Sequence, residues 1–318
     1  MAQVFSPGGG RTAPRAESVL VGMLLVIFAG CLWSTQGLLI RLMDGADPWQ
    51  ILLVRGLGMV LGTVPVLVIL SGGKPWSLVR QAGWRGLAAG LAIGASGIFF
   101  VVALNFTTIA NAVFMVGAGP FFAAFLGRWI LAEKVRRETW IAMAASLFGV
   151  FLMVFDGLES GRMIGSILML FSTLAFAGYS IILKSAAGRD MNPATLHKGL
   201  VEAAVAAFVL LGAGLWTESG AGADVSPAMS VRDVLLGLAI GLLLALGMLL
   251  FTLGARRLSP AEMTLGSLTE LVLSPIWVWL FVHEVPDRLT LAGGAIIISA
   301  IIYQAVTGAR RARPPAVV

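Results

Sequence analysis

Three ionisable side chains lie deep inside long apolar stretches of the sequence. Glu202 and Glu270 stand nine and ten residues after a proline, and Arg55 stands seven residues after another. In helices that begin at those prolines, the two carboxylates would lie roughly 14 Å along the axis, near the middle of a membrane. A charge in hydrocarbon is costly unless it is paired or hydrated. The three side chains therefore predict a polar interior site. There, a carboxylate would bind an ammonium group or exchange a proton, and a guanidinium would bind a carboxylate.

Two interpretations stay open for Arg55 and for Glu270. Arg55 either anchors a substrate carboxylate or forms an ion pair with a buried acid. Glu270 either binds substrate or stays protonated and hydrogen-bonded between helices. His197 and Lys198 precede Glu202 by five and four residues, and they would draw that carboxylate towards the membrane surface. Glu270 is therefore the strongest candidate.

Polar and aromatic side chains complete the predicted substrate pocket. Five of them interrupt apolar stretches: Trp33, Gln36, Asn111, Tyr179 and Trp277. Helix breaks are expected beside this pocket, because a proline removes a hydrogen bond inside a helix and frees carbonyl groups for another partner. The residues that predict such breaks, and gating movements at them, are Gly117, Gly119, Pro120 and Pro275.

The residue types give little support for a metal site or a bound cofactor. Cys31 is the single cysteine, and His197 and His283 are the only histidines, so we expect no metal site. Neither a nucleophile–base–acid set nor a glycine–lysine phosphate loop occurs, so we expect neither cofactor nor ATP coupling, and no enzyme activity. An intramembrane enzyme that works through acids alone remains the least favoured alternative.

The composition is typical of an integral membrane protein. Of 318 residues, 58% are hydrophobic and 12% charged, whereas a soluble domain carries roughly a quarter charged residues. The apolar runs are long and continuous, which excludes a soluble enzyme, a disordered chain and a transmembrane barrel. The sequence predicts an all-α integral membrane protein with ten transmembrane helices near residues 18–41, 49–71, 84–104, 109–131, 138–155, 163–184, 194–216, 233–254, 260–282 and 288–307.

Loop charges predict the orientation of these helices. With a cytoplasmic N-terminus, inner segments hold sixteen Lys and Arg residues and outer segments hold four, as the positive-inside rule requires. Both termini are then cytoplasmic, with a disordered segment at 1–17 and a basic tail at 309–318. The net charge of +6 is explained by these loops, so no nucleic acid partner is expected.

The two halves of the chain share an ordered series of landmarks. Residues 90–94 recur word for word at 237–241, and further pairs follow at offsets of 143 to 151 residues. This predicts two repeats, at 18–156 and 163–308, with five helices each. Because five is odd, the second repeat enters the membrane inverted, an arrangement that secondary transporters use for alternating access.

These landmarks also resemble a known family. The chain is similar to EamA-type members of the drug/metabolite transporter superfamily in its Trp33-Ser34, Arg41, Pro48 and Arg55, in 103–105 and 131–134, and in 270–275 followed by Trp277, Trp279 and Glu284. One departure is Leu271, which stands where the first repeat has Pro120. The resemblance implies transport, with amino acids and related metabolites as the first substrate class.

Together these observations predict a secondary transporter that exports a small polar metabolite, an amino acid or related compound, by alternating access. The alternative is a proton-coupled exporter of lipophilic cations or drugs. The expected setting is the lipid bilayer of a bacterial inner membrane, with protons as a candidate coupling ion and the chain as a monomer or homodimer. Glu133 and Glu284, which follow their helices directly, are interpreted as structural.

Overall fold

The structure is a computed structural model, which describes residues 16–130, 132, 137–159, 162–186, 190–218, 229–255, 257 and 260–312. Within these ranges the chain forms α-helices and no strand. The helices are α1 (Ala16–Arg41), α2 (Pro48–Leu70), α3 (Pro75–Ala103), α4 (Ile109–Gly117), α5 (Gly119–Ile130), α6 (Arg137–Glu159), α7 (Met163–Ser185), α8 (Pro193–Glu218), α9 (Val231–Ala255), α10 (Pro260–Val282) and α11 (Arg288–Ala312).

The described helices have the dimensions of membrane spans. Eight stretches are long and apolar enough to cross a bilayer, the pair α4 and α5 counting as one. Two shorter apolar stretches lie in α10 and α11, at Thr269–Val282 and Arg288–Tyr303. The prediction of an all-α integral membrane protein is confirmed. Residues 1–15 and 313–318 of the predicted tails lie outside the described part, and 309–312 continue α11.

The main differences from the predicted helices lie in α3 and in the segment 109–131. α3 begins at Pro75 rather than near 84, and it kinks at Gly83, whose φ of 57° and ψ of −151° are not helical. The extra segment carries Arg80 and the exposed Trp76, residues typical of a membrane surface. The predicted helix 109–131 is divided into α4 and α5 at Ala118.

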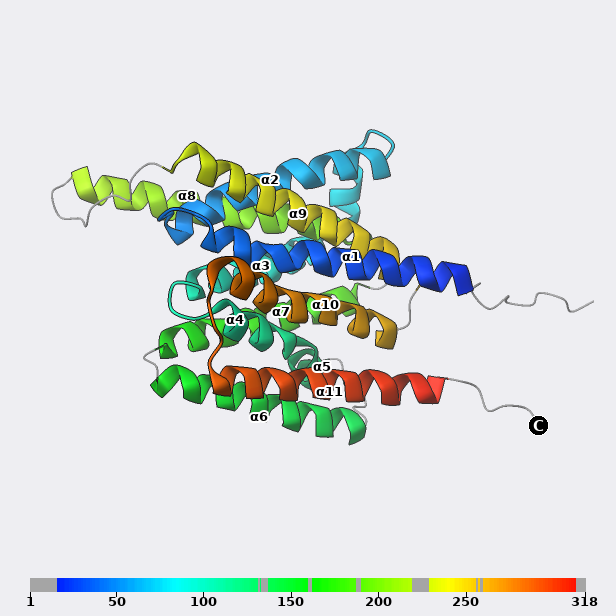
Figure 1. Ribbon diagram of the computed structural model, residues 1–318. Coiled ribbons are helices and arrows are strands. Elements are labelled where there is room, and N and C mark those ends of the chain that lie inside the picture. The colour runs from blue at the N-terminus through cyan, green and yellow to red at the C-terminus, as the bar shows by residue number, and fades with distance from the viewer. Residues whose placement is uncertain are drawn as a thin grey trace, which may run out of the picture.

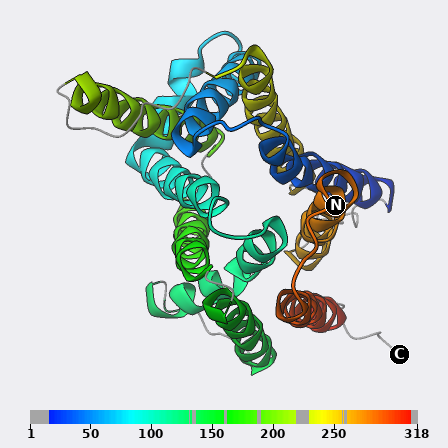
Figure 2. The same ribbon diagram turned by 60° about the vertical axis from the view of Figure 1, so that its left-hand side comes forward.

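Most of the long helices lie roughly along a common axis, and the start of α1 and the end of α11 lie at the same end of the bundle (Figure 1). Helices from the two halves of the sequence interleave: α1 packs on α9 and α10, α2 on α8 and α9, α3 on α7 and α8, and α6 on α11. Turning the molecule shows α6 and α11 together at its lower edge (Figure 2).

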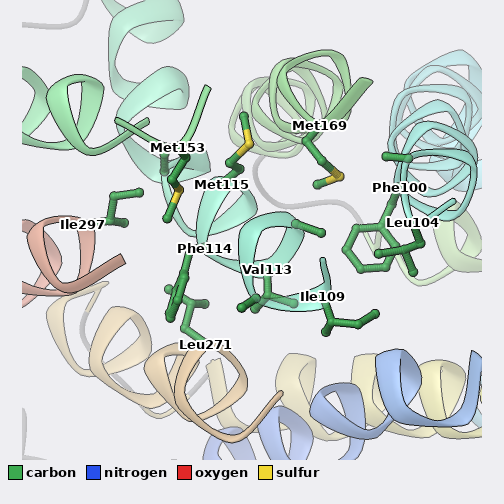
Figure 3. Close-up of a cluster of buried hydrophobic side chains, with 14 of the residues drawn as sticks. Phe100, Leu104, Ile109, Val113, Phe114, Met115, Met153, Met169, Leu271 and Ile297 are labelled. Carbon is green, nitrogen blue, oxygen red and sulfur yellow. The ribbon is translucent and has the colours of Figure 1, made fainter. Parts of the chain in front are cut away.

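The main apolar core surrounds the short helix α4. Ile109, Val113, Phe114 and Met115 are all buried, so α4 presents apolar side chains in every direction. Around it, Figure 3 shows residues of five other helices: Phe100 and Leu104 at the end of α3, Met153 on α6, Met169 on α7, Leu271 on α10 and Ile297 on α11. A helix that is buried on most sides carries mainly apolar residues, and α4, with Asn111 as its buried polar residue, is the central helix of this core.

Candidate functional site

Two of the predicted charges form an ion pair with each other. Nε of Arg55 donates to Oε2 of Glu202 at 3.1 Å, and Nη2 lies 2.8 Å from Oε1. The two side chains are 1% and 0% exposed. Of the two interpretations of Arg55, the ion pair with a buried acid is therefore the one that the geometry supports.

Lys198 joins this pair as a third buried charge. It lies one turn before Glu202 on α8, and its Nζ forms an ion pair with Oε1 of that carboxylate. The sequence alone counted Lys198 with the inner-loop cations, whereas the structure places it in the second turn of α8. Its spacing of four residues from Glu202 was the signal for this contact, because such residues share one helix face.

A glycine on α3 makes room for the three charges, which we call the Arg55–Lys198–Glu202 triad. A Cβ at Gly97 would collide with Glu202, Arg55 and Lys198. The triad thus joins α2 and α8 with two cations and one carboxylate, and α3 packs against it through Gly97. Since removal of the carboxylate strands buried charge, a triad of this kind fixes how these helices pack.

Glu270 lies apart from the triad, on α10. Its side chain is partly buried, and the side chain of Gln36 on α1 lies close enough to influence its carboxyl group. Within the described part of the chain, no ion pair involves Glu270. Two of the predicted substrate residues, Gln36 and Glu270, therefore come together from opposite halves of the sequence.

Two of the predicted pocket residues, Trp33 and Trp277, lie on the same helices as Gln36 and Glu270. Nε1 of Trp277 on α10 donates to Oγ of Ser34 on α1 at 3.0 Å. Nε1 of Trp33 donates to the Leu244 carbonyl of α9 at 3.3 Å, and its ring lies 5.5 Å from that of Phe251. Hydrogen bonds thus fix both indole rings between α1, α9 and α10.

The remaining predicted pocket residues lie elsewhere. Tyr179 on α7 is buried beside Phe176, with 6.1 Å between ring centroids. Asn111 on α4 donates through Nδ2 to Thr107 Oγ1 at 2.7 Å and to Ser166 Oγ at 3.3 Å. It therefore ties the loop before α4 to α7.

Of the two predicted helix breaks, the one before Pro120 is present in the structure and the one at Pro275 is not. α4 ends at Gly117 and α5 begins at Gly119, so this span is interrupted, and Pro120 falls in the first turn of the second piece. A Cβ at Gly119 would lie 2.8 Å from Cδ1 of Phe176, so α7 crosses directly over the break. Pro275, by contrast, lies inside α10, which continues through it.

Ion pairs also lie at the ends of the helices. Arg41 at the end of α1 pairs with Glu284 and Arg232 with Asp44, which links the two halves, and Arg162 pairs with Asp287 within the second half. The charge distribution predicts that all three arginines lie on the outer side of the membrane. Glu133, the counterpart of Glu284, lies outside the described residues.

Comparison with known proteins finds a matching family and related sequences. The profile of the EamA-like transporter family matches residues 20–155 and again residues 163–304. Over 293 residues the chain is 26% identical to the pseudopaline exporter CntI of Pseudomonas aeruginosa, covering 88% of this chain and 94% of the exporter. It is also 26% identical over 306 residues to protein RarD of Streptomyces exfoliatus, covering 92% and 91%.

One solved crystal structure shares the fold. It matches with a TM-score of 0.62 and 20% sequence identity, over 93% of this chain and 99% of that one. At this identity the likeness concerns the fold alone.

Proposed function

The chain belongs to the EamA-like transporter family, and on that premise we propose that it is a secondary transporter that works by alternating access. Its cargo is a small polar metabolite, an amino acid or related compound, and the direction is export. It works as ten membrane helices in two inverted repeats, 18–156 and 163–308, with both termini in the cytoplasm of a bacterial cell.

The observation that carries this proposal is the exchange symmetry of the helix contacts. If α1, α2 and α3 correspond to α7, α8 and α9, the contact of α1 with α9 has its counterpart in that of α7 with α3. The contact of α2 with α9 likewise matches that of α8 with α3. In the same scheme α10 corresponds to α4 and α5, and α1 with α10 matches α7 with α4 and α5. Two similar units that face each other in this way support alternating access through movement of one unit against the other.

Glycine contacts support the same symmetry at single residues. A Cβ at Gly56 would lie 2.6 Å from the carbonyl oxygen of Gly199, and a Cβ at Gly199 would lie 2.8 Å from that of Gly56. Gly149 and Gly293 show the same mutual contact at 2.7 and 2.6 Å. The partners are 143 and 144 residues apart, close to the repeat offset. Such contacts let helix backbones touch, which suits a moving interface between bundles.

Transport in whole cells tests this function. Cells with and without the protein are compared by metabolite analysis of medium and cytoplasm, and the compound enriched in the medium is then tested for counterflow in proteoliposomes. The proposal expects accumulation in the medium that Glu270→Gln abolishes at unchanged membrane abundance. If no compound redistributes and proteoliposomes show no counterflow, transport is the wrong function.

A second function is favoured by one specific observation. Because Arg55 is held by Glu202, it offers no free anchor for a substrate carboxylate, and Glu270 has no cationic partner among the described ion pairs. This arrangement suits an exporter of lipophilic cations driven by protons. Growth under quaternary ammonium compounds decides between the two, since only such an exporter raises the tolerated concentration.

A further inference from the structure

The connection between α3 and α4 is held by side chains from distant parts of the chain. The guanidinium of Arg41, at the end of α1, donates to the carbonyl oxygens of Leu104 and Thr107 at 3.0 and 2.9 Å. Oε1 of Glu284, in the loop after α10, accepts the backbone N–H of Ile109 at 2.6 Å. Arg41 and Glu284 also pair with each other at 2.9 Å. One ion pair therefore binds three backbone groups of this connection.

The start of α7 holds the same connection from another side. A Cβ at Gly165 would lie 2.7 Å from the carbonyl oxygen of Phe106. Nδ2 of Asn111 donates to Oγ1 of Thr107 at 2.7 Å and to Oγ of Ser166 at 3.3 Å. The connection belongs to the first half of the sequence, whereas α7 and the loop after α10 belong to the second half. The two halves are thus fastened together at this end of the helices.

The ion pair lies at the boundary between water and a buried interior. Arg41 and Glu284 keep 27% and 21% of their side chains exposed, whereas Ile109 is fully buried. Seven residues before Arg41, two turns along α1, Ser34 is also fully buried. There α1 meets α10 again, since Nε1 of Trp277 donates to Oγ of Ser34 at 3.0 Å. The Arg41–Glu284 pair therefore covers the outermost contact between α1 and α10.

A fastening of this kind can be undone without a large cost. When ion pairs and hydrogen bonds at a water boundary break, water replaces the lost partners, so each contributes little to stability. Alternating access requires the two halves to separate at one end of the transporter while they stay together at the other. The contacts of Arg41 and Glu284 join the halves at one end only, and they meet this requirement.

We propose that Arg41, Glu284 and the connection 104–109 form a gate at this end of the transporter, and that the gate is closed in this structure. The inference rests on the proposed transport function and adds the place at which the substrate path opens. When the ion pair breaks, the guanidinium releases two carbonyls and the carboxylate releases one N–H. The α3–α4 connection then moves away from α7 and from the loop after α10.

Access to a buried thiol tests the gate. Cys31→Ser removes the only cysteine, and Ser34→Cys then places one thiol beneath the ion pair. A charged methanethiosulfonate reagent that cannot cross membranes is added to the full chain in vesicles, on the side from which Asp44→Cys is labelled. The result then does not depend on the predicted orientation. We expect slow labelling of Ser34→Cys by itself, and at least tenfold faster labelling when Glu284→Gln or Arg41→Gln is added.

Two controls separate gate opening from general loosening. Arg232→Gln breaks the exposed ion pair with Asp44 and should leave the labelling of Ser34→Cys slow. Ser146→Cys, buried on α6, should stay protected when Glu284→Gln is added. Unchanged labelling of Ser34→Cys in both gate variants overturns the gate. Equal acceleration at Ser146→Cys also overturns it, because the ion pair then stabilises the whole bundle rather than one end. If labelling accelerates as expected but no substrate is transported, the gate stands and the transport function fails.

Discussion

Arg41 and Glu284, 243 residues apart in the sequence, join the end of α1 to the loop that follows α10. Nε of Arg41 donates to Oε2 of Glu284 at 2.9 Å. The other carboxylate oxygen accepts the backbone N–H of Ile109 at 2.6 Å, the first residue of α4. The same guanidinium also donates to the carbonyls of Leu104 and Thr107 at 3.0 and 2.9 Å. One ion pair therefore ties α1, the α3–α4 connection and α10 together at the expected outer face.

The first prediction concerns this pair. Glu284→Ala removes a partly buried ion pair together with the acid that caps α4, so we expect a loss of about 1–2 kcal/mol in the free energy of unfolding. The pair should show a coupling of about 1 kcal/mol in a double-mutant cycle with Arg41→Ala. The control cycle uses Arg232 and Asp44, which are exposed and paired, and should give a coupling near zero. Equal couplings in both cycles would contradict a special role for Arg41 and Glu284.

The second prediction separates the members of the Arg55–Lys198–Glu202 triad. Glu202→Gln leaves two buried cations without a counter-ion and should destabilise the protein by about 3–5 kcal/mol. Arg55→Met loses the two contacts that the arginine makes to the carboxylate but keeps the Lys198–Glu202 pair, so it should cost less than Glu202→Gln. Lys198→Met removes the excess positive charge and leaves the Arg55–Glu202 pair intact, so it should cost much less. Unfolding temperatures in detergent measure all three. A Lys198 variant as unstable as the Glu202 variant would show that the lysine is an equal partner in the triad.

The helices could be predicted from the sequence because the pattern that determines them is local. A run of about 20 apolar residues is long enough to span a bilayer. Each predicted segment overlaps a described helix, and eight described stretches are long and apolar enough to cross a membrane. The early start of α3 was also signalled, because a proline at the first helical position, here Pro75, favours a helix start. The predicted helix began near residue 84, after Arg80, although a helix segment on the membrane surface accommodates such a charge.

The pairing of the functional side chains depends on contacts between distant parts of the chain. Arg55 and Glu202 are 147 residues apart, and nothing in either local sequence identifies the other as its partner. For the same reason, the contact of Gln36 with Glu270 follows only from the packing of α1 on α10. The break at Gly117–Gly119 could be predicted, because its cause, a proline after two glycines, is local.

The third prediction tests the close helix contacts. A Cβ at Gly56 would lie 2.6 Å from the Gly199 carbonyl oxygen and 2.8 Å from the Ala203 amide nitrogen, both of them backbone atoms that cannot turn away. We therefore expect Gly56→Ala to destabilise the protein by about 1–3 kcal/mol and to slow transport. Gly212→Ala is the matched control on the same interface helix α8, because nothing lies within 4 Å of its added Cβ. Similar effects of the two substitutions would show that the α2–α8 contact tolerates a methyl group.

The fourth prediction concerns orientation in the membrane. Cys31 is the only cysteine, so Cys31→Ser provides a background without thiols, in which Asp44→Cys and Lys74→Cys each add one at an exposed position. These positions lie at opposite ends of α2. The loop charges put Asp44 outside and Lys74 inside, so a maleimide that cannot cross membranes should label only the Asp44 variant in intact cells and both variants after permeabilisation. Labelling of the Lys74 variant alone in intact cells would reverse the orientation of the whole chain. The three arginine pairs at the helix ends would then lie at the cytoplasmic face.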